Sequence, residues 1–146
     1  ENILKLHHLR HAVQSFYERR PAEQGFPAEL LEFLRHSGAP AAPEDLQLFE
    51  RILAEAQATA KTWDGRVVFV YLPTWERYRL PELASKDRDN VLGIAMRLKL
   101  YVMDMHEVFV THPDPLSLFP FRRYAHYNEA GHKLVGEEVV RQLGKL

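Results

Sequence analysis

The residues best suited to chemistry lie near the end of the chain, in the stretch Ala125-His126-Tyr127-Asn128-Glu129-Ala130-Gly131-His132. A histidine in a loop can serve as a general base. Asn128 is a good helix N-cap because its side-chain oxygen can accept a hydrogen bond from a first-turn backbone N–H. His126 precedes that cap, so we expect it in a loop, where a scaffold usually holds reactive groups.

Helical segments account for much of the rest of the chain. The closing helix is predicted from Glu129 to about Leu143, because Leu134, Val135 and Val139 give it an apolar face. The other predicted helices cover Asn2 to Arg19, Ala28 to His36, Pro43 to about Trp63, and Asp87 to Leu98.

Two segments read as strands of a parallel sheet. Arg66 to Leu72 is almost continuously apolar and rich in β-branched residues, which is typical of a strand buried on both faces. Pro73-Thr74-Trp75 then leaves its carboxyl end, where ligands bind in open α/β sheets. Leu100 to Met103 is the second predicted strand. The pattern indicates an α/β fold with helices packed on a parallel sheet.

Two further segments are predicted to be loops. Tyr78 to Leu83 is polar and aromatic, and Glu107 to Pro120 contains three prolines that disfavour regular structure.

Composition restricts the classes of function. The 146 residues suit a single domain, and 19 basic residues against 20 acidic ones predict no binding to nucleic acid or anionic membranes. No apolar run is long enough to span a membrane, so we expect a soluble chain. The absence of cysteine excludes disulfides and thiolate metal sites but does not fix the compartment, which would be extracytoplasmic if an upstream signal was removed.

The order His-aromatic-Asn-x-x-Gly-His before an amphipathic helix resembles the last sequence block of the SGNH (GDSL-type) hydrolases. The resemblance implies that His126 activates a serine nucleophile and that Asn128 and Gly131 are structural at the site. His132 also matches a family position, and we expect it to be structural, packing under the loop. It implies the carboxyl-terminal part of a three-layer α/β/α fold. Looser similarity extends to Asp114–Pro120, Tyr101–Phe109 and the strand ending at Pro73.

The acid that should orient the histidine departs from the family pattern. The family commonly has an aspartate three residues before its catalytic histidine, where this chain has Arg123. Asp114 and Asp104 are the candidates to replace it. A Ser-His dyad aided by a backbone carbonyl is a third alternative.

The family's Gly-Asp-Ser block is absent, and none of Ser15, Ser37, Ser85 and Ser117 follows a strand at a sharp turn. We therefore expect the nucleophile-bearing part on sequence before Glu1, removed or present as another piece. The chain alone is then expected to be inactive. It should also associate with that missing part or with itself, because an incomplete sheet exposes apolar surface.

The expected substrate is an ester, such as an acyl or acetyl group on a carbohydrate or lipid. Trp75, Tyr78 and Tyr124 are candidates to line its cleft, and Arg123 could attract an anionic group. No cofactor is expected. No metal is expected either, because His7 and His11 have no acidic ligand at a recognisable spacing.

Two alternative functions remain open. A non-catalytic α/β binding or interaction module on the same frame is favoured by Arg123 and by the missing serine. An acyltransferase would use the same Ser-His chemistry as a hydrolase, so these residues do not separate the two.

Overall fold

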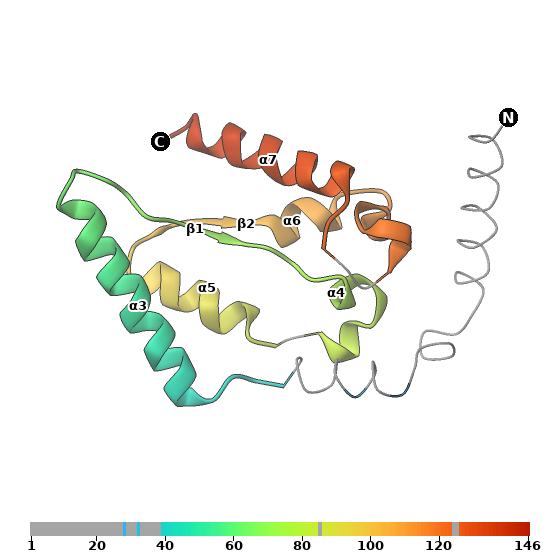
Figure 1. The fold of residues 1–146 in the computed structure, drawn as a ribbon, viewed down its shortest axis with the longest axis horizontal. Helices are drawn as coiled ribbons and strands as arrows, with labels where there is room; N and C mark the ends of the chain where they lie inside the picture. Colours follow the sequence, from blue (N-terminus) through green and yellow to red (C-terminus); the bar gives the residue numbers. More distant parts are fainter. Residues whose placement is uncertain (1–27, 29–31, 33–38, 85, 124–125) are drawn as a thin grey trace, which may run out of the picture.

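The computed structural model describes residues 28, 32, 39–84, 86–123 and 126–146 (Figure 1). The helix predicted over residues 2–19 lies outside this part of the chain. Of the helix predicted over 28–36 only Ala28 and Glu32 are described, and both are helical. The described part is a mixed α/β structure with five helices and two strands: α3 (Pro43–Lys61), β1 (Val68–Tyr71), α4 (Glu76–Arg79), α5 (Arg88–Arg97), β2 (Tyr101–Asp104), α6 (Met105–Val110) and α7 (Glu129–Leu143).

The two strands form a small parallel sheet, as the sequence predicts. They pair in register from Val68 opposite Tyr101 to Tyr71 opposite Asp104. Each observed strand has only four residues, and the side chains of β1 are half-buried rather than fully buried on both faces. Because the strands are parallel, their carboxyl ends meet at one edge of the sheet.

Helices cover the strand pair from both sides. Helix α7 runs along one side, and α3 and α5 lie on the other (Figure 1). Helix α3 begins at Pro43 as expected, and its Ile52 side chain is 53% exposed. None of the helices within the described ranges is long and apolar enough to cross a bilayer.

The main apolar core gathers at the carboxyl edge of the sheet. Leu134, Val135 and Val139 of α7 pack against it. Its fully buried members are Trp75, Leu80, Met103, Met105, Phe109, Leu118 and Phe119. Most of these residues lie in segments that directly follow β1 or β2, so the core fixes the paths by which the chain leaves both strands.

Both loop predictions are wrong in part. Helix α6 occupies the start of the segment predicted as a loop from residue 107, since Asp104 caps it by accepting a hydrogen bond from the His106 N–H at 3.0 Å. Met105 and Phe109, one turn apart, are both fully buried there. Short helical turns also replace the loop predicted over 78–83, where α4 is followed by a 3₁₀ turn, η1 (Pro81–Leu83).

The prediction for the closing helix is confirmed, including its cap. Asn128 Oδ1 accepts a hydrogen bond from the Gly131 N–H at 3.0 Å, while its Nδ2 donates to the Ser117 carbonyl at 2.7 Å. The Asn128 N–H donates to the Leu118 carbonyl at 3.0 Å. These bonds fasten the first turn of α7 to a second 3₁₀ turn, η2 (Pro115–Leu118).

We predict opposite effects for two glycine substitutions in α7. A Cβ at Gly131 would lie 2.6 Å from the Leu118 carbonyl oxygen, whereas a Cβ at Gly136 would meet nothing within 4 Å. Gly131→Ala should therefore lower the free energy of unfolding by about 1–3 kcal/mol. The control, Gly136→Ala, should raise it by about 0.5–1 kcal/mol, because alanine favours a helix interior. Urea unfolding measures both, and a neutral Gly131→Ala would contradict the close contact.

Candidate functional site

A pocket of about 570 Å³ lies beside the carboxyl end of β1. Residues 72–76, which follow β1, form one wall, and Phe119, His126, Tyr127 and His132 complete the lining. The pocket thus brings together the two segments that the sequence singles out, the exit from the first strand and the histidine loop.

The histidine loop is attached to the strand exit by a hydrogen bond. The half-buried phenol of Tyr127 donates to the carbonyl of Pro73. Its ring packs on Phe109 and Phe119, with centroids 5.0 Å and 5.3 Å away. His126, directly before Tyr127, is exposed and lines the pocket. The side chain predicted to be a general base is therefore accessible to a ligand there.

Of the candidate substrate-binding residues that the structure describes, Trp75 alone is found in the lining. It is 1% exposed, and its Nε1–H donates to the Arg122 carbonyl at 3.0 Å. Arg123 is exposed and does not line the pocket, and Tyr124 lies outside the described residues.

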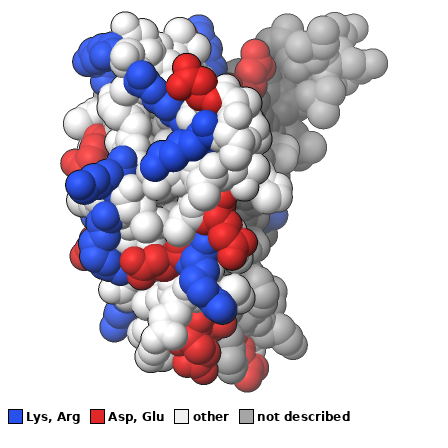
Figure 2. Space-filling view, turned by 90° about the vertical axis from the view of Figure 1, so that its left-hand side faces the viewer, with Lys and Arg blue, Asp and Glu red and all other residues white. Residues whose placement is uncertain are grey.

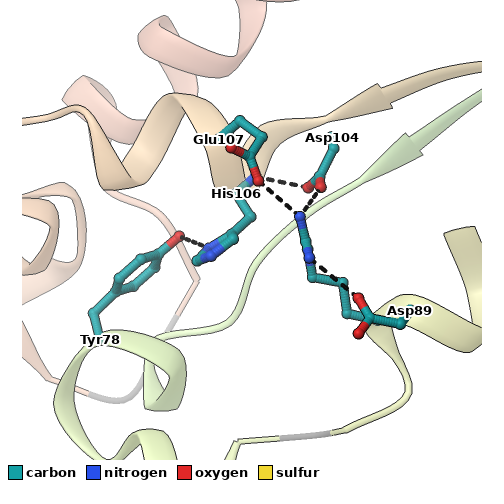
Figure 3. A network of polar contacts seen from close by, with 6 residues as sticks. Tyr78, Asp89, Asp104, His106 and Glu107 are labelled. Atoms are coloured by element: carbon teal, nitrogen blue, oxygen red, sulfur yellow. Dashed lines mark hydrogen bonds and ion pairs between the residues drawn. The ribbon is translucent and has the colours of Figure 1, made fainter.

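Tyr78 packs in the core instead of lining the pocket. Its hydroxyl hydrogen-bonds to His106 Nδ1 at 3.1 Å, as Figure 3 shows, and its ring stacks on Phe109 with centroids 5.9 Å apart. Burial lowers the pKa of His106, and the nearby guanidinium groups of Arg88 and Arg77 lower it further. This pair holds α4 against α6 rather than facing a ligand.

The two candidate acids are engaged with arginines. Asp104 accepts a hydrogen bond from Arg88, which also binds Glu107 at 2.8 Å and Asp89 at 3.2 Å (Figure 3). Asp114 forms an ion pair with Arg122. Neither aspartate lines the pocket that holds His126, so a role for either in orienting it stays a prediction.

No serine side chain lines the pocket within the described part of the chain. Ser117 donates to the Asp114 carbonyl at 2.7 Å. Ser15, Ser37 and Ser85 fall outside the described residues. Thr74 supplies the one aliphatic hydroxyl in the lining.

Two further ionisable side chains at the pocket are not assigned to it from the sequence. His132 is exposed, and its ring meets that of Tyr127 edge-on at 5.8 Å. Glu76 is 7% exposed and begins α4. Its position directly after Pro73-Thr74-Trp75, at the carboxyl end of a parallel strand, is the sequence signal that could have identified it.

Comparisons of the chain with protein-family models, curated proteins and solved structures gave no match. The resemblance to SGNH hydrolases thus rests on the quoted sequence pattern and stays a prediction. Among the residues whose placement is described, no group of three or more His, Asp or Glu side chains could hold a metal ion.

We predict that the Tyr78 phenol contributes to a decrease in the free energy of unfolding as the pH rises above about 10. Burial raises the pKa of Tyr78 and of Tyr127 above the ordinary value of 10.0. Below about pH 10 both phenols are protonated in the folded and unfolded states, so they add no pH dependence. Above it the unfolded chain loses protons that the folded chain keeps, and stability falls by at most about 1.4 kcal/mol per pH unit for each phenol.

Tyr78→Phe should therefore reduce the slope of unfolding free energy against pH in the alkaline range. Urea unfolding at several pH values measures this slope. An unchanged slope in the variant would show that the Tyr78 phenol ionises alike in both states.

Proposed function

We propose that the pocket belongs to a serine ester hydrolase, with His126 as the general base and the serine supplied from outside this chain. One observation carries the proposal. The loop before α7 brings an exposed histidine into a pocket at the carboxyl end of a parallel strand, where ligands bind in α/β sheets.

The chemistry needs a single proton acceptor at this position. A ring nitrogen of His126 would take the serine Oγ proton as Oγ bonds to the ester carbonyl carbon, and would return that proton to the departing alcohol. Water then attacks the acyl-serine, with the same histidine as base, and releases the acid. Leu72, Pro73 and Phe119 give the pocket apolar walls that suit an acyl group on a carbohydrate or lipid.

Exposed apolar side chains support association with a further segment. Leu48 and Ile52 on α3 are about half exposed, at 47% and 53%, and Val140 on α7 is 71% exposed. Within the described sheet, β1 and β2 pair only with each other, so each strand has a second edge that this pairing does not use. Such edges and apolar patches are common sites for added strands or partner surfaces.

A non-catalytic binding module is the second candidate. It is favoured by the lack of a serine side chain in the pocket lining of the described chain and by Arg123 at the usual acid position. Its apolar pocket would bind a small molecule without transforming it.

We predict a large kinetic difference between two histidine substitutions. In the full polypeptide of the reading frame, His126→Ala should lower kcat/KM for p-nitrophenyl acetate by about 10²–10⁴-fold, the usual contribution of a general base. His132→Ala, the matched control in the same pocket, should change it by less than about tenfold. Urea unfolding of both variants checks that folding is retained. Product analysis with an added alcohol separates hydrolysis from acyl transfer.

Three outcomes would contradict parts of this assignment. A larger loss of kcat/KM with His132→Ala than with His126→Ala would identify His132 as the general base. Hydrolysis by the 146-residue chain alone, abolished by His126→Ala, would exclude an external serine. A full polypeptide that binds esters without hydrolysing them would favour the binding module.

A further inference from the structure

Glu76 is a buried residue, and one oxygen of its carboxylate has no hydrogen-bond partner among the described residues. The residue is 7% exposed, and its Oε2 atom is buried with no hydrogen-bond donor. None of the ion pairs among the described residues involves Glu76. A carboxylate oxygen in this position has lost most of its hydration without a compensating hydrogen bond, which is unfavourable.

Other carboxylates near the core are compensated. Asp104 is bound by Arg88, and Asp114 by Arg122. On the surface, Glu138 accepts hydrogen bonds from Arg141, which lowers the pKa of its carboxyl to about 2. The contrast matters because unpaired buried charges persist mainly where binding or catalysis uses them.

Hydrogen bonds and buried neighbours hold the backbone around Glu76 in place. The preceding Trp75 is 1% exposed and is bonded through Nε1 to the Arg122 carbonyl. The Glu76 carbonyl accepts a hydrogen bond from the N–H of Leu80, which is fully buried, at 2.7 Å. The residue is therefore held at the pocket that it lines.

Among the described residues, the lining of this pocket contains no lysine or arginine, and Glu76 is its one carboxylate. A hollow of about 330 Å³ at the opposite end of the sheet differs, because Lys61, Arg66 and Lys99 line it. Figure 2 shows the face at that end, with many Lys and Arg side chains interspersed with Asp and Glu. Of these two hollows, the pocket beside Glu76 is thus the one suited to a positive group.

We propose that Glu76 determines the specificity of the pocket and that the ligand carries a primary ammonium group on an apolar body. The inference rests on the proposed function, since it assigns a chemical class to the substrate of the same site. An ammonium would give Glu76 a charge-assisted hydrogen bond, the strongest kind available to a carboxylate. Leu72, Pro73 and Phe119 would contact the apolar body.

The test is an NMR titration of the 146-residue chain with n-butylammonium chloride, with butan-1-ol and sodium butyrate as probes of matched length. The ring signals of His126 and His132 report on the pocket. We expect them to shift with butylammonium and not with butyrate, and binding of butan-1-ol to be at least about tenfold weaker. Glu76→Gln should weaken butylammonium binding at least about tenfold.

Glu82→Gln is the matched control, because Glu82 is exposed on η1 and lies outside the pocket. It should leave the affinity unchanged. Glu76→Gln is expected to fold, since it removes an unpaired buried charge, and urea unfolding checks this. If it does not fold, the comparison of butylammonium with butan-1-ol on the unsubstituted chain decides.

Equal binding of butylammonium and butan-1-ol, no binding of butylammonium, or an unchanged affinity in a folded Glu76→Gln variant would overturn the inference. The titration requires neither a serine nor turnover, so its failure differs from failure of the proposed function. If butylammonium binds but His126→Ala does not change ester hydrolysis, the ammonium site is supported and the hydrolase assignment is contradicted. If ester hydrolysis requires His126 but butylammonium does not bind, the hydrolase assignment is supported and the ammonium site is contradicted.

Discussion

The close contact between the first turn of α7 and η2 is the constraint on which the site depends. A backbone oxygen of η2, that of Leu118, occupies the space that a side chain at Gly131 would need. The same carbonyl accepts the Asn128 N–H, and the neighbouring Ser117 carbonyl accepts the Asn128 side chain. The backbones of η2 and of the first turn of α7 are thus in direct contact, and this contact fixes where α7 begins relative to η2.

The consequence of this contact is the position of Tyr127 and His126. With α7 seated on η2, the Tyr127 ring fills the space between Phe109 and Phe119, and its hydroxyl reaches Pro73 at the end of β1. His126 is adjacent in sequence and follows Tyr127 to the same place. A hydrogen bond between the loop before α7 and the segment after β1 therefore joins two walls of the pocket.

The same edge of the sheet carries two polar arrangements with different energetic character. Around Arg88 the charges are paired, and Tyr78 and His106 satisfy each other, so this region stabilises the joints between α4, α5 and α6. Glu76 is buried without such compensation. Charge pairing fixes structure in the first arrangement, whereas the second leaves a carboxylate ready for an external donor.

The sequence by itself determined the local elements with strong periodic or capping signals. The apolar run before Pro73 predicted a parallel strand, and Asn128 predicted where α7 begins; both predictions are confirmed. Prediction from the sequence failed where burial in the tertiary structure outweighs the local preference for a loop. Met105 and Phe109 hold a helix in the core where the later prolines suggested a loop.

Only the tertiary structure decided which side chains share the pocket. The sequence pattern placed His126 in the loop before α7, because that pattern is local, but only the fold brings it beside the end of β1. The sequence could not show that Glu76 and His132 line the pocket or that Tyr78 does not. These positions depend on how α4 and α7 pack on the aromatic core. Burial and missing partners are properties of the folded chain, whereas caps and strand runs are determined by residues adjacent in sequence.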